Sequence, residues 1–268
     1  MASIEYTLAK LFGLDGKVAV VNGGAGRIGS AVSAGLAGAG AKVCVLDLAY
    51  EAAADLAARV AAESGRDVIA VKADSTSRES LEAAVAEITA RLGTPNILVN
   101  TTQFRGKGFY SSDVSAYPLE AWNSVLDVNL TGVFLACQVF GRAMAASGGN
   151  IVNLASTYGV VSADPRIYGD SGVNSPVSYA ASKAAVINLC RYLAVHWREQ
   201  NIRVNCLVPG GVYDRQAEEF VKAYSERTPL GRMAKADEYV GAILFMVSQA
   251  STYMTGSVVT VDGGWTSW

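Results

Sequence analysis

The sequence predicts an α/β protein built on a doubly wound parallel sheet of about seven strands, with helices on both faces. Three observations support this fold class. Short, almost wholly apolar segments alternate with longer segments of helical periodicity, as expected for strands buried on both faces. Hydrophobic residues make up 51% of the 268 residues and charged residues only 17%, which suits a large core. A glycine-rich turn joins the first strand to the first helix.

Each element follows from its own pattern. Short apolar runs predict strands at residues 17–21, 42–47, 67–73, 96–100, 150–156, 202–208 and 257–262. Apolar residues at helical spacing predict helices at residues 28–39, 51–64, 77–92, 119–146, 179–197, 216–225 and 235–249. No linker, repeat or low-complexity segment interrupts this alternation, so we expect one domain over residues 1–268.

Composition restricts the functions that are open to the chain. The net charge of −2 gives no basic surface for a nucleic-acid partner. We find no apolar run of membrane-spanning length and no apolar core of signal-peptide type in residues 1–10, so we expect a cytoplasmic protein without a membrane partner. The four cysteines are far apart in apolar segments, which favours buried free thiols. With His196 as the single histidine, we expect no metal site.

The first turn is expected to bind a dinucleotide. Gly24, Gly26 and Gly29 match G-x-G-x-x-G between a strand and a helix, which makes the predicted architecture a Rossmann fold. Such glycines let backbone N–H groups approach a pyrophosphate at the helix N-terminus. Asp47 ends the next strand, at the place of an acid that hydrogen-bonds a ribose 2′-hydroxyl, although a helix cap is its alternative role. Leu48 follows, rather than an arginine that could pair with a 2′-phosphate, so the sequence favours NAD over NADP.

Tyr179 and Lys183 are candidates for acid–base chemistry. They are four residues apart in a segment of helical periodicity, so they lie one turn apart on the same face. A nearby ammonium favours the phenolate and lowers the pKa of a tyrosine, which can then exchange a proton with an alcohol or a carbonyl. The pattern alone is weak, because Tyr6 and Lys10 repeat it ahead of the first strand, and a surface pair is the alternative interpretation.

Several further motifs occur in a characteristic order. They are Asp74 after the third strand, Asn100-Thr101-Thr102, Asn129 within Val-Asn-Leu-Thr-Gly, Ser156 ending Ile-Val-Asn-Leu-Ala-Ser, Pro209-Gly210 and Val261-Asp262-Gly263-Gly264. Together with the glycine turn and the Tyr–Lys pair, they resemble the short-chain dehydrogenase/reductase family along nearly the whole chain. This resemblance implies a cofactor half at about residues 15–150 and a catalytic and substrate half at about residues 151–268.

The resemblance also implies the roles of individual residues. The catalytic residues are then Asn129, Ser156, Tyr179 and Lys183. Tyr179 is the general acid/base, Ser156 hydrogen-bonds the substrate oxygen, Lys183 lowers the pKa of Tyr179 and binds the nicotinamide ribose, and Asn129 holds a water. A satisfied buried amide is the alternative for Asn129. The cofactor-binding residues are then Gly23, Gly24, Gly26, Arg27, Ile28, Gly29, Asp47, Leu48, Asp74, Ser75, Asn100, Thr101, Thr102, Tyr179, Lys183, Pro209, Gly210 and Val212.

Some positions depart from the family pattern. This chain has Asn22 where the family usually has a threonine, and Arg27 where it has the middle glycine of the turn. It has Thr101-Thr102 in place of Ala-Gly, and Val212, Tyr213 and Asp214 where a threonine is usual. We expect Gly26 to take over the role of the glycine that Arg27 replaces. We expect the backbone at Val212 to hold the carboxamide. Arg27 is expected either to touch a phosphate or to lie exposed at the helix start.

The segment 157–178, between Ser156 and Tyr179, is longer than is usual in the family. Because both its ends are anchored at catalytic residues, it is expected to lie beside the active-site mouth, with residues 213–228 as a second wall. The expected substrate-contacting residues are Arg105, Ser156, Arg166, Tyr168, Asn174, Tyr179 and Tyr213. Such side chains hydrogen-bond hydroxyls, and an arginine can fork onto a carboxylate. A subunit contact is the alternative role of the segment, and Trp265 and Trp268 are expected in packing or an interface.

We therefore expect an NAD-dependent oxidoreductase that transfers a hydride between the nicotinamide and a secondary alcohol or ketone of a polar substrate. A sugar, a sugar acid or a polyol is favoured, and the residues resemble those of sugar and gluconate-type dehydrogenases. The alternative is a reductase of a 3-oxoacyl thioester or a hydrophobic ring ketone. A non-catalytic NAD-binding scaffold is disfavoured by the intact catalytic set. The family resemblance implies self-association, as a homotetramer or homodimer.

Overall fold

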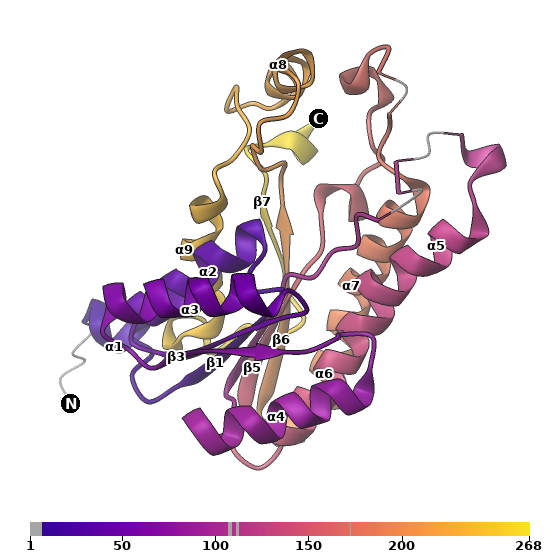
Figure 1. Cartoon of the computed structure of the whole chain (residues 1–268). Helices are drawn as coiled ribbons and strands as arrows, with labels where there is room; N and C mark the ends of the chain where they lie inside the picture. The colour runs from indigo at the N-terminus through magenta and orange to yellow at the C-terminus, as the bar shows by residue number, and fades with distance from the viewer. Residues whose placement is uncertain (1–6, 107–108, 111–112, 172) are drawn as a thin grey trace.

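The computed structural model describes residues 7–106, 109–110, 113–171 and 173–268. They form a seven-stranded sheet in the order β3-β2-β1-β4-β5-β6-β7, in which every neighbouring pair is parallel (Figure 1). The strands are β1 (Val18–Asn22), β2 (Lys42–Asp47), β3 (Val68–Lys72), β4 (Ile97–Asn100), β5 (Gly149–Leu154), β6 (Ile202–Pro209) and β7 (Val258–Val261). The predicted single-domain Rossmann fold is confirmed.

The helices follow the predicted order. The α-helices are α1 (Leu8–Phe12), α2 (Arg27–Gly38), α3 (Tyr50–Ser64), α4 (Arg78–Leu92), α5 (Leu119–Leu126), α6 (Val133–Met144), α7 (Val177–His196), α8 (Glu218–Arg227) and α9 (Val240–Val247). Short 3₁₀ turns are η1 (Val114–Ala116), η3 (Thr157–Gly159), η4 (Pro165–Tyr168), η5 (Arg198–Gln200), η6 (Ala236–Tyr239), η7 (Gln249–Ser251) and η8 (Trp265–Ser267).

Two predicted helices differ from the observed ones. The helix expected at residues 119–146 is interrupted by a π-helical turn, η2 (Asp127–Gly132), which joins α5 to α6. The helix expected at residues 235–249 is the α-helix α9 with 3₁₀ turns on both sides. The short helix α1 was not expected. It begins at Thr7, whose hydroxyl caps it by accepting a hydrogen bond from the backbone N–H of Lys10.

The sheet separates two hydrophobic layers. Side chains alternate along β1, so that Val18 and Val20 pack toward α4, α6 and α7, whereas Ala19 and Val21 pack toward α2, α3 and α9 (Figure 1). All four of these side chains are buried. Burial on both faces explains why the strand segments are almost wholly apolar and could be recognised from the sequence.

The strand order reverses at β1, and this reversal positions the candidate site. The chain moves from β1 outward to β2 and β3, then returns to place β4 on the other side of β1. In open α/β sheets, ligands bind in the crevice outside the carboxyl ends of the strands at such a reversal. The glycine turn after β1 and the threonines after β4 lie at this point.

Three asparagines form a hydrogen-bonded ladder across the same edge of the sheet. Asn22, Asn100 and Asn153 occupy paired positions on β1, β4 and β5. The side chain of Asn22 donates to that of Asn100 at 2.9 Å, and Asn100 donates to Asn153 at 2.7 Å. Ser75 donates to Asn22 at one end and Asn153 donates to the sulfur of Cys190 at the other. The ladder thus satisfies buried amides directly behind the crevice.

We expected no segment of membrane-spanning length, but one helical segment meets that length. Leu119–Met144, which comprises α5, η2 and α6, is long and apolar enough by length and composition to cross a membrane. Half of its most apolar window is buried inside the protein, and the segment packs against α4 and α7. A core helix of a globular protein has the same length and composition, so this segment is weak support for a membrane role.

Candidate active site

The glycine turn after β1 is closely packed. Gly23 has a φ of +79°, and a Cβ atom there would lie 2.9 Å from the Thr101 hydroxyl oxygen. A Cβ atom at Gly29 would lie 2.2 Å from the carbonyl oxygen of Gly23, so only glycine fits. At Gly26 the nearest heavy atom would be 3.1 Å away, a weaker constraint than expected for a glycine that replaces the missing one. At Gly24 a Cβ atom would lie 2.7 Å from the carbonyl oxygen of Val21, so the steric constraint lies at Gly23, Gly24 and Gly29.

Asp47 closes one side of this turn. One carboxylate oxygen accepts a hydrogen bond from the backbone N–H of Ala25 at 3.0 Å, and the other accepts one from Ala49 at 2.9 Å. These contacts fix the carboxylate beside the glycine turn and leave lone pairs for a further donor. Leu48, which follows it, is 61% exposed. Asp74 lies after β3 and accepts hydrogen bonds from both the backbone and the hydroxyl of Thr76, while Ser75 caps the asparagine ladder.

The crevice between β1 and β4 fits a dinucleotide. The hydroxyl of Thr101 contacts the carbonyls of Asn22 and Gly23 at 3.0 and 2.9 Å. The buried hydroxyl of Thr102 has no hydrogen-bond partner among the described residues. Thr102 adjoins Gly23, because a Cβ atom on Gly23 would lie 3.0 Å from its backbone nitrogen. An unsatisfied hydroxyl at the edge of a glycine turn is ready to bond a polar ligand group.

Ser156, Tyr179 and Lys183 converge at the carboxyl end of β5. Ser156 lies two residues after β5, is 6% exposed and accepts a hydrogen bond from the backbone N–H of Tyr158 at 3.2 Å. Tyr179 and Lys183 lie one turn apart on α7, and the ammonium is 5.7 Å from the centre of the phenol ring. Lys183 is buried and donates to the carbonyl of Leu154 at 2.9 Å.

Asn129 lies in the π-helical turn η2 and is fully buried. Its carbonyl oxygen accepts from the backbone N–H of Phe104 at 2.8 Å, and its amide donates to the Ser182 hydroxyl at 3.4 Å. Ser182 in turn donates to the carbonyl of Tyr179 at 2.8 Å. Asn129 therefore ties the loop after β4 to the helix that carries the Tyr–Lys pair. Single π-turns inside helices are frequent at functional sites.

The electrostatics of the pair differ from the expectation. Burial raises the pKa of Tyr179, and it outweighs the opposing effects of a hydrogen bond with Ser156 and of the Arg105 charge. We expected Lys183 to lower the pKa of Tyr179, but the groups of the chain together raise it. Desolvation lowers the pKa of Lys183 to about 8, and its ammonium is engaged by the Leu154 carbonyl.

Two segments and one residue pack together in a hydrophobic cluster that we call the aromatic cap. They are η4 (Pro165–Tyr168), α8 (Glu218–Arg227) and Trp265. The rings of Tyr168 and Phe220 lie 5.3 Å apart, which joins η4 to α8. The ring of Trp265 stacks on that of Tyr224 at 4.2 Å. The Asp164 carboxylate lies 3.2 Å from the Nε of Arg227, whose guanidinium lies over Trp265.

The expected substrate residues have different surroundings. Arg166 is exposed and its guanidinium forks onto Asp164 at 2.7 and 2.8 Å. This ion pair lies at the surface, and a contact between Arg166 and a substrate stays a prediction. Arg105 is exposed and its charge acts on Tyr179, while Tyr168 is partly buried near the same phenol. The Asn174 carbonyl oxygen accepts from the backbone N–H of Ser175 at 2.8 Å, and Tyr213 is 51% exposed.

Three aromatic residues near the site were not identified from the sequence. The ring of Phe109 lies 6.0 Å from that of Tyr179. Tyr158 and Tyr168 pack against the same hydrophobic cluster, and burial raises the pKa of the Tyr158 phenol. The Tyr224 hydroxyl accepts a hydrogen bond from the backbone N–H of Gly211 at 2.6 Å. In the sequence, Tyr158 could have been found as an aromatic residue two positions after the candidate serine, Ser156.

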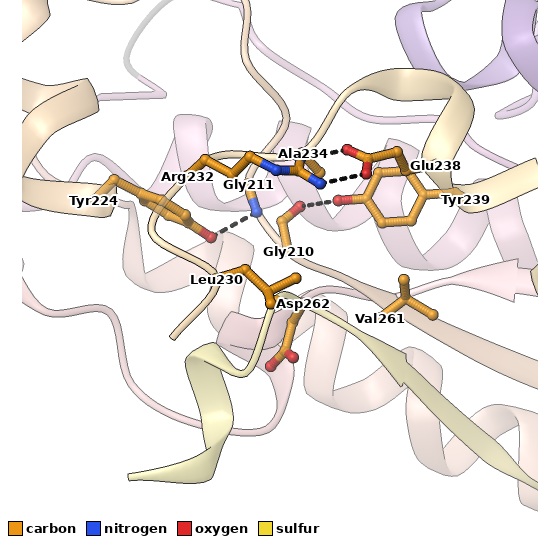
Figure 2. Close-up of a pocket in the computed structure, with 11 residues that line it drawn as sticks. Gly210, Gly211, Tyr224, Leu230, Arg232, Ala234, Glu238, Tyr239, Val261 and Asp262 are labelled. Carbon is orange, nitrogen blue, oxygen red and sulfur yellow. Dashed lines mark hydrogen bonds and ion pairs between the residues drawn. The ribbon is translucent and has the colours of Figure 1, made fainter. Parts of the chain in front are cut away.

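Side chains from neighbouring segments hold the turn after β6 in place (Figure 2). Tyr239 donates to the carbonyl of Gly210 at 2.9 Å, and Tyr224 binds the next backbone N–H. Arg232 forks onto Glu238 beside them, at 2.6 Å for both contacts. A small pocket is lined by these residues together with Gly211, Leu230, Ala234, Val261, Asp262 and Gly263. Its lining does not include Ser156 or Tyr179, so we assign it to the packing of the turn.

Comparisons with known proteins identify the family. A family model described as enoyl-(acyl carrier protein) reductase matches residues 23–266. A crystal structure of a short-chain dehydrogenase from Leptospira borgpetersenii serovar Hardjo-bovis with bound NAD⁺ superposes with a TM-score of 0.81 at 32% identity, covering 98% of this chain and 97% of that one. The chain belongs to the short-chain dehydrogenase/reductase family.

Two further relatives resemble this short-chain dehydrogenase/reductase closely. Galactitol 2-dehydrogenase (L-tagatose-forming) of Cereibacter sphaeroides is 37% identical over 266 residues, which cover 96% of this chain and 98% of that protein. The crystal structure of a gluconate 5-dehydrogenase from Burkholderia cenocepacia in complex with NADP and tartrate has a TM-score of 0.87 at 31% identity, covering 98% and 100% of the two chains. The protein is accordingly an oxidoreductase that acts on CH–OH groups with a nicotinamide cofactor.

Proposed function

We propose that this short-chain dehydrogenase/reductase is an NAD-dependent dehydrogenase of a polyol, a sugar or a sugar acid. The observation that carries the proposal is the convergence of Ser156, Tyr179 and Lys183 at the carboxyl end of β5, in the crevice that begins at the glycine turn. The names of the relatives, which act on galactitol and gluconate, support the substrate class.

Tyr179 is the proposed general acid/base. Because burial raises the pKa of its phenol, Tyr179 is protonated at neutral pH and is set to donate a proton to a carbonyl oxygen. In the oxidation direction the phenolate must take the alcohol proton, and a rise in pH favours that form. Ser156, whose hydroxyl lies close enough to lower the pKa of Tyr179, is placed to bond the same substrate oxygen. Bound in the crevice, the nicotinamide would accept or donate the hydride.

Lys183 and Asn129 are proposed to support this chemistry through the cofactor and a bound water. The ammonium of Lys183 has three N–H donors, of which the Leu154 carbonyl accepts one, so it has donors left for the hydroxyls of a nicotinamide ribose. Asn129 fixes α7 to the loop that carries Arg105 through its contacts with Phe104 and Ser182. We propose that it also holds a water of the proton relay.

We propose that the cofactor is NAD rather than NADP. A carboxylate with both oxygens fixed by backbone N–H groups stands at the end of β2, where it accepts a ribose hydroxyl and repels a 2′-phosphate. Leu48, the exposed next residue, offers no charge to that phosphate. The remaining contacts would come from the glycine turn, Asp74 and the residues after β4 and β6 named above.

On the substrate side we propose Arg105, Arg166, Tyr168, Asn174 and Tyr213 as hydrogen-bonding residues. Arg166 would exchange its exposed contact with Asp164 for the substrate. Phenols and amides around a phenolic acid suit a substrate with several hydroxyls. The competing proposal, reduction of an acyl thioester, is favoured by the description of the matching family model. A screen of polyols, sugar acids and 3-hydroxyacyl thioesters with NAD, following the absorbance of the reduced cofactor, distinguishes the two. Turnover confined to thioesters would overturn the polyol proposal.

We further propose that the protein is a cytoplasmic homotetramer or homodimer. Phe134 on α6 and Tyr192 and Val195 on α7 are 39%, 69% and 66% exposed, and they lie on two of the helices that cover one face of the sheet. Exposed apolar side chains on adjacent helices suit a subunit contact. Light scattering on the purified protein tests this: a mass of one chain, 28.0 kDa, would contradict it.

A further inference from the structure

The arginine that replaces a family glycine is bound across the crevice. Arg27 is the first residue of α2, at the helix end where a dinucleotide places its pyrophosphate. Its guanidinium forms an ion pair with Asp214 in the loop after β6. It also donates to the carbonyl oxygen of Tyr213 at 3.3 Å. Arg27 therefore connects the two sides of the cofactor crevice, from the glycine turn to the beginning of the second wall.

The loop that carries Asp214 is held in place by local contacts. The backbone N–H of Asp214 donates to the side-chain oxygen of Gln216 at 2.6 Å, and the Gln216 amide donates to the Val212 carbonyl at 2.9 Å. The backbone N–H of Tyr213 donates to the Ala234 carbonyl at 2.9 Å. Arg215 has a φ of +56°, an unusual conformation for a residue with a side chain. Asp214 is thus presented to Arg27 by a fixed turn.

This arrangement puts a carboxylate where the family usually has a threonine, next to an anion-binding helix terminus. A carboxylate and a pyrophosphate carry like charges, so both cannot favourably occupy the same arginine. Arg27 can fork onto either anion, and both of its terminal nitrogens are now directed at residues 213 and 214. The side chains are 47% and 35% exposed, so the ion pair can open without burying a charge.

We propose that Asp214 is an internal competitor for Arg27: it occupies the arginine until a dinucleotide pyrophosphate replaces it. This inference rests on the proposed NAD-dependent function. Two consequences of opposite sign follow. Loss of Arg27 removes a cation from the pyrophosphate, whereas loss of Asp214 releases that cation and removes a repelling charge. Binding of NAD also frees the beginning of the second wall from the glycine turn, which couples the cofactor to the substrate side.

The test is the binding of NADH to the substrate-free enzyme, followed by the fluorescence of the reduced nicotinamide at low ionic strength. Arg27→Gln is expected to raise the Kd about three- to tenfold, and Asp214→Asn to lower it about two- to fivefold. The changes should lie mainly in the dissociation rate measured by stopped flow. Arg59→Gln and Asp55→Asn make the same charge changes on exposed positions of α3 and should leave the Kd within twofold.

The double variant separates competition from a simple charge effect. In the Arg27→Gln background, Asp214→Asn should lower the Kd less than it does in the wild type, because no arginine remains to be released. Weaker or unchanged binding in Asp214→Asn, with Asp214→Ser giving the same result, overturns the inference and indicates that the ion pair clamps the cofactor. If the wild type itself does not bind NADH, the proposed NAD function fails. If the wild type binds and all variants match their controls, only the inference fails.

Discussion

Replacing Asn100 by leucine should destabilise the protein strongly, although the two side chains have the same number of heavy atoms. Asn100 is 1% exposed and stands in the middle of the asparagine ladder. Its oxygen accepts from Asn22 and its amide donates to Asn153. Leucine would leave one donor on Asn22 without this partner, and it would leave the Asn153 oxygen with only the weak S–H donor of Cys137. An orphaned buried group costs about 1–3 kcal/mol and the weakened acceptor adds to it, so the free energy of unfolding should fall by about 1–5 kcal/mol.

Urea unfolding of the wild type and variants measures this loss, because a shift in midpoint at constant slope reports stability. Asn123→Leu on the exposed side of α5 is the matched control and should change stability by no more than about 0.5 kcal/mol. Asn153→Leu should cost less in the Asn100→Leu background than in the wild type, because one shared hydrogen bond is already lost. A loss below about 1 kcal/mol for Asn100→Leu would show that water or repacking satisfies the two neighbours, and would refute the reasoning.

Three further predictions concern the site. Tyr179→Phe should lower kcat about 10²- to 10⁴-fold while NADH still binds, and near-normal turnover would contradict its role as acid/base. Asp47→Ala should reduce the ratio of kcat/KM for NAD to that for NADP; a higher efficiency with NADP in the wild type, or an unchanged ratio in the variant, would rule out the assignment. The pKa of Lys183 is lowered to about 8, so between that pH and its ordinary value near 10.5 the unfolded chain binds more protons than the folded one. Stability relative to Lys183→Met should therefore rise with pH across this window, by up to about 3 kcal/mol, and be lowest below pH 8; parallel urea-unfolding profiles of the two proteins would contradict it.

The sequence was sufficient for the fold because the parallel sheet imposes a simple rule. Strands covered on both faces must be apolar throughout, and such runs are easy to recognise between helical segments. The ladder was not predictable in the same way. Asn22, Asn100 and Asn153 are more than 50 residues apart in sequence, and only the strand order and register bring their side chains together. Each asparagine therefore looked like an isolated polar residue or part of a motif.

The prediction of the site was also limited, because the tertiary structure decides which groups each side chain contacts. The charge of Arg166 is visible in the sequence, but its ion pair with Asp164 is not. The π-helical turn that carries Asn129 has no sequence signal in a continuous apolar helix pattern. The pKa of Tyr179 was expected to fall because its neighbour Lys183 was visible, while the burial that raises it depends on the packed structure.

The order in which the residues of the aromatic cap are synthesised has a consequence for folding on the ribosome. Strands β1 to β4 and the glycine turn lie within the first 100 residues, so this part of the sheet can pair while the rest is still being synthesised. Trp265, by contrast, follows all seven strands in the sequence, yet it is the fully buried ring on which Tyr224 stacks. Helix α8 therefore leaves the ribosome before the residue on which its Tyr224 stacks. A nascent chain can pair the strands beside the glycine turn early, but it can complete the packing of α8 only after synthesis has passed Trp265.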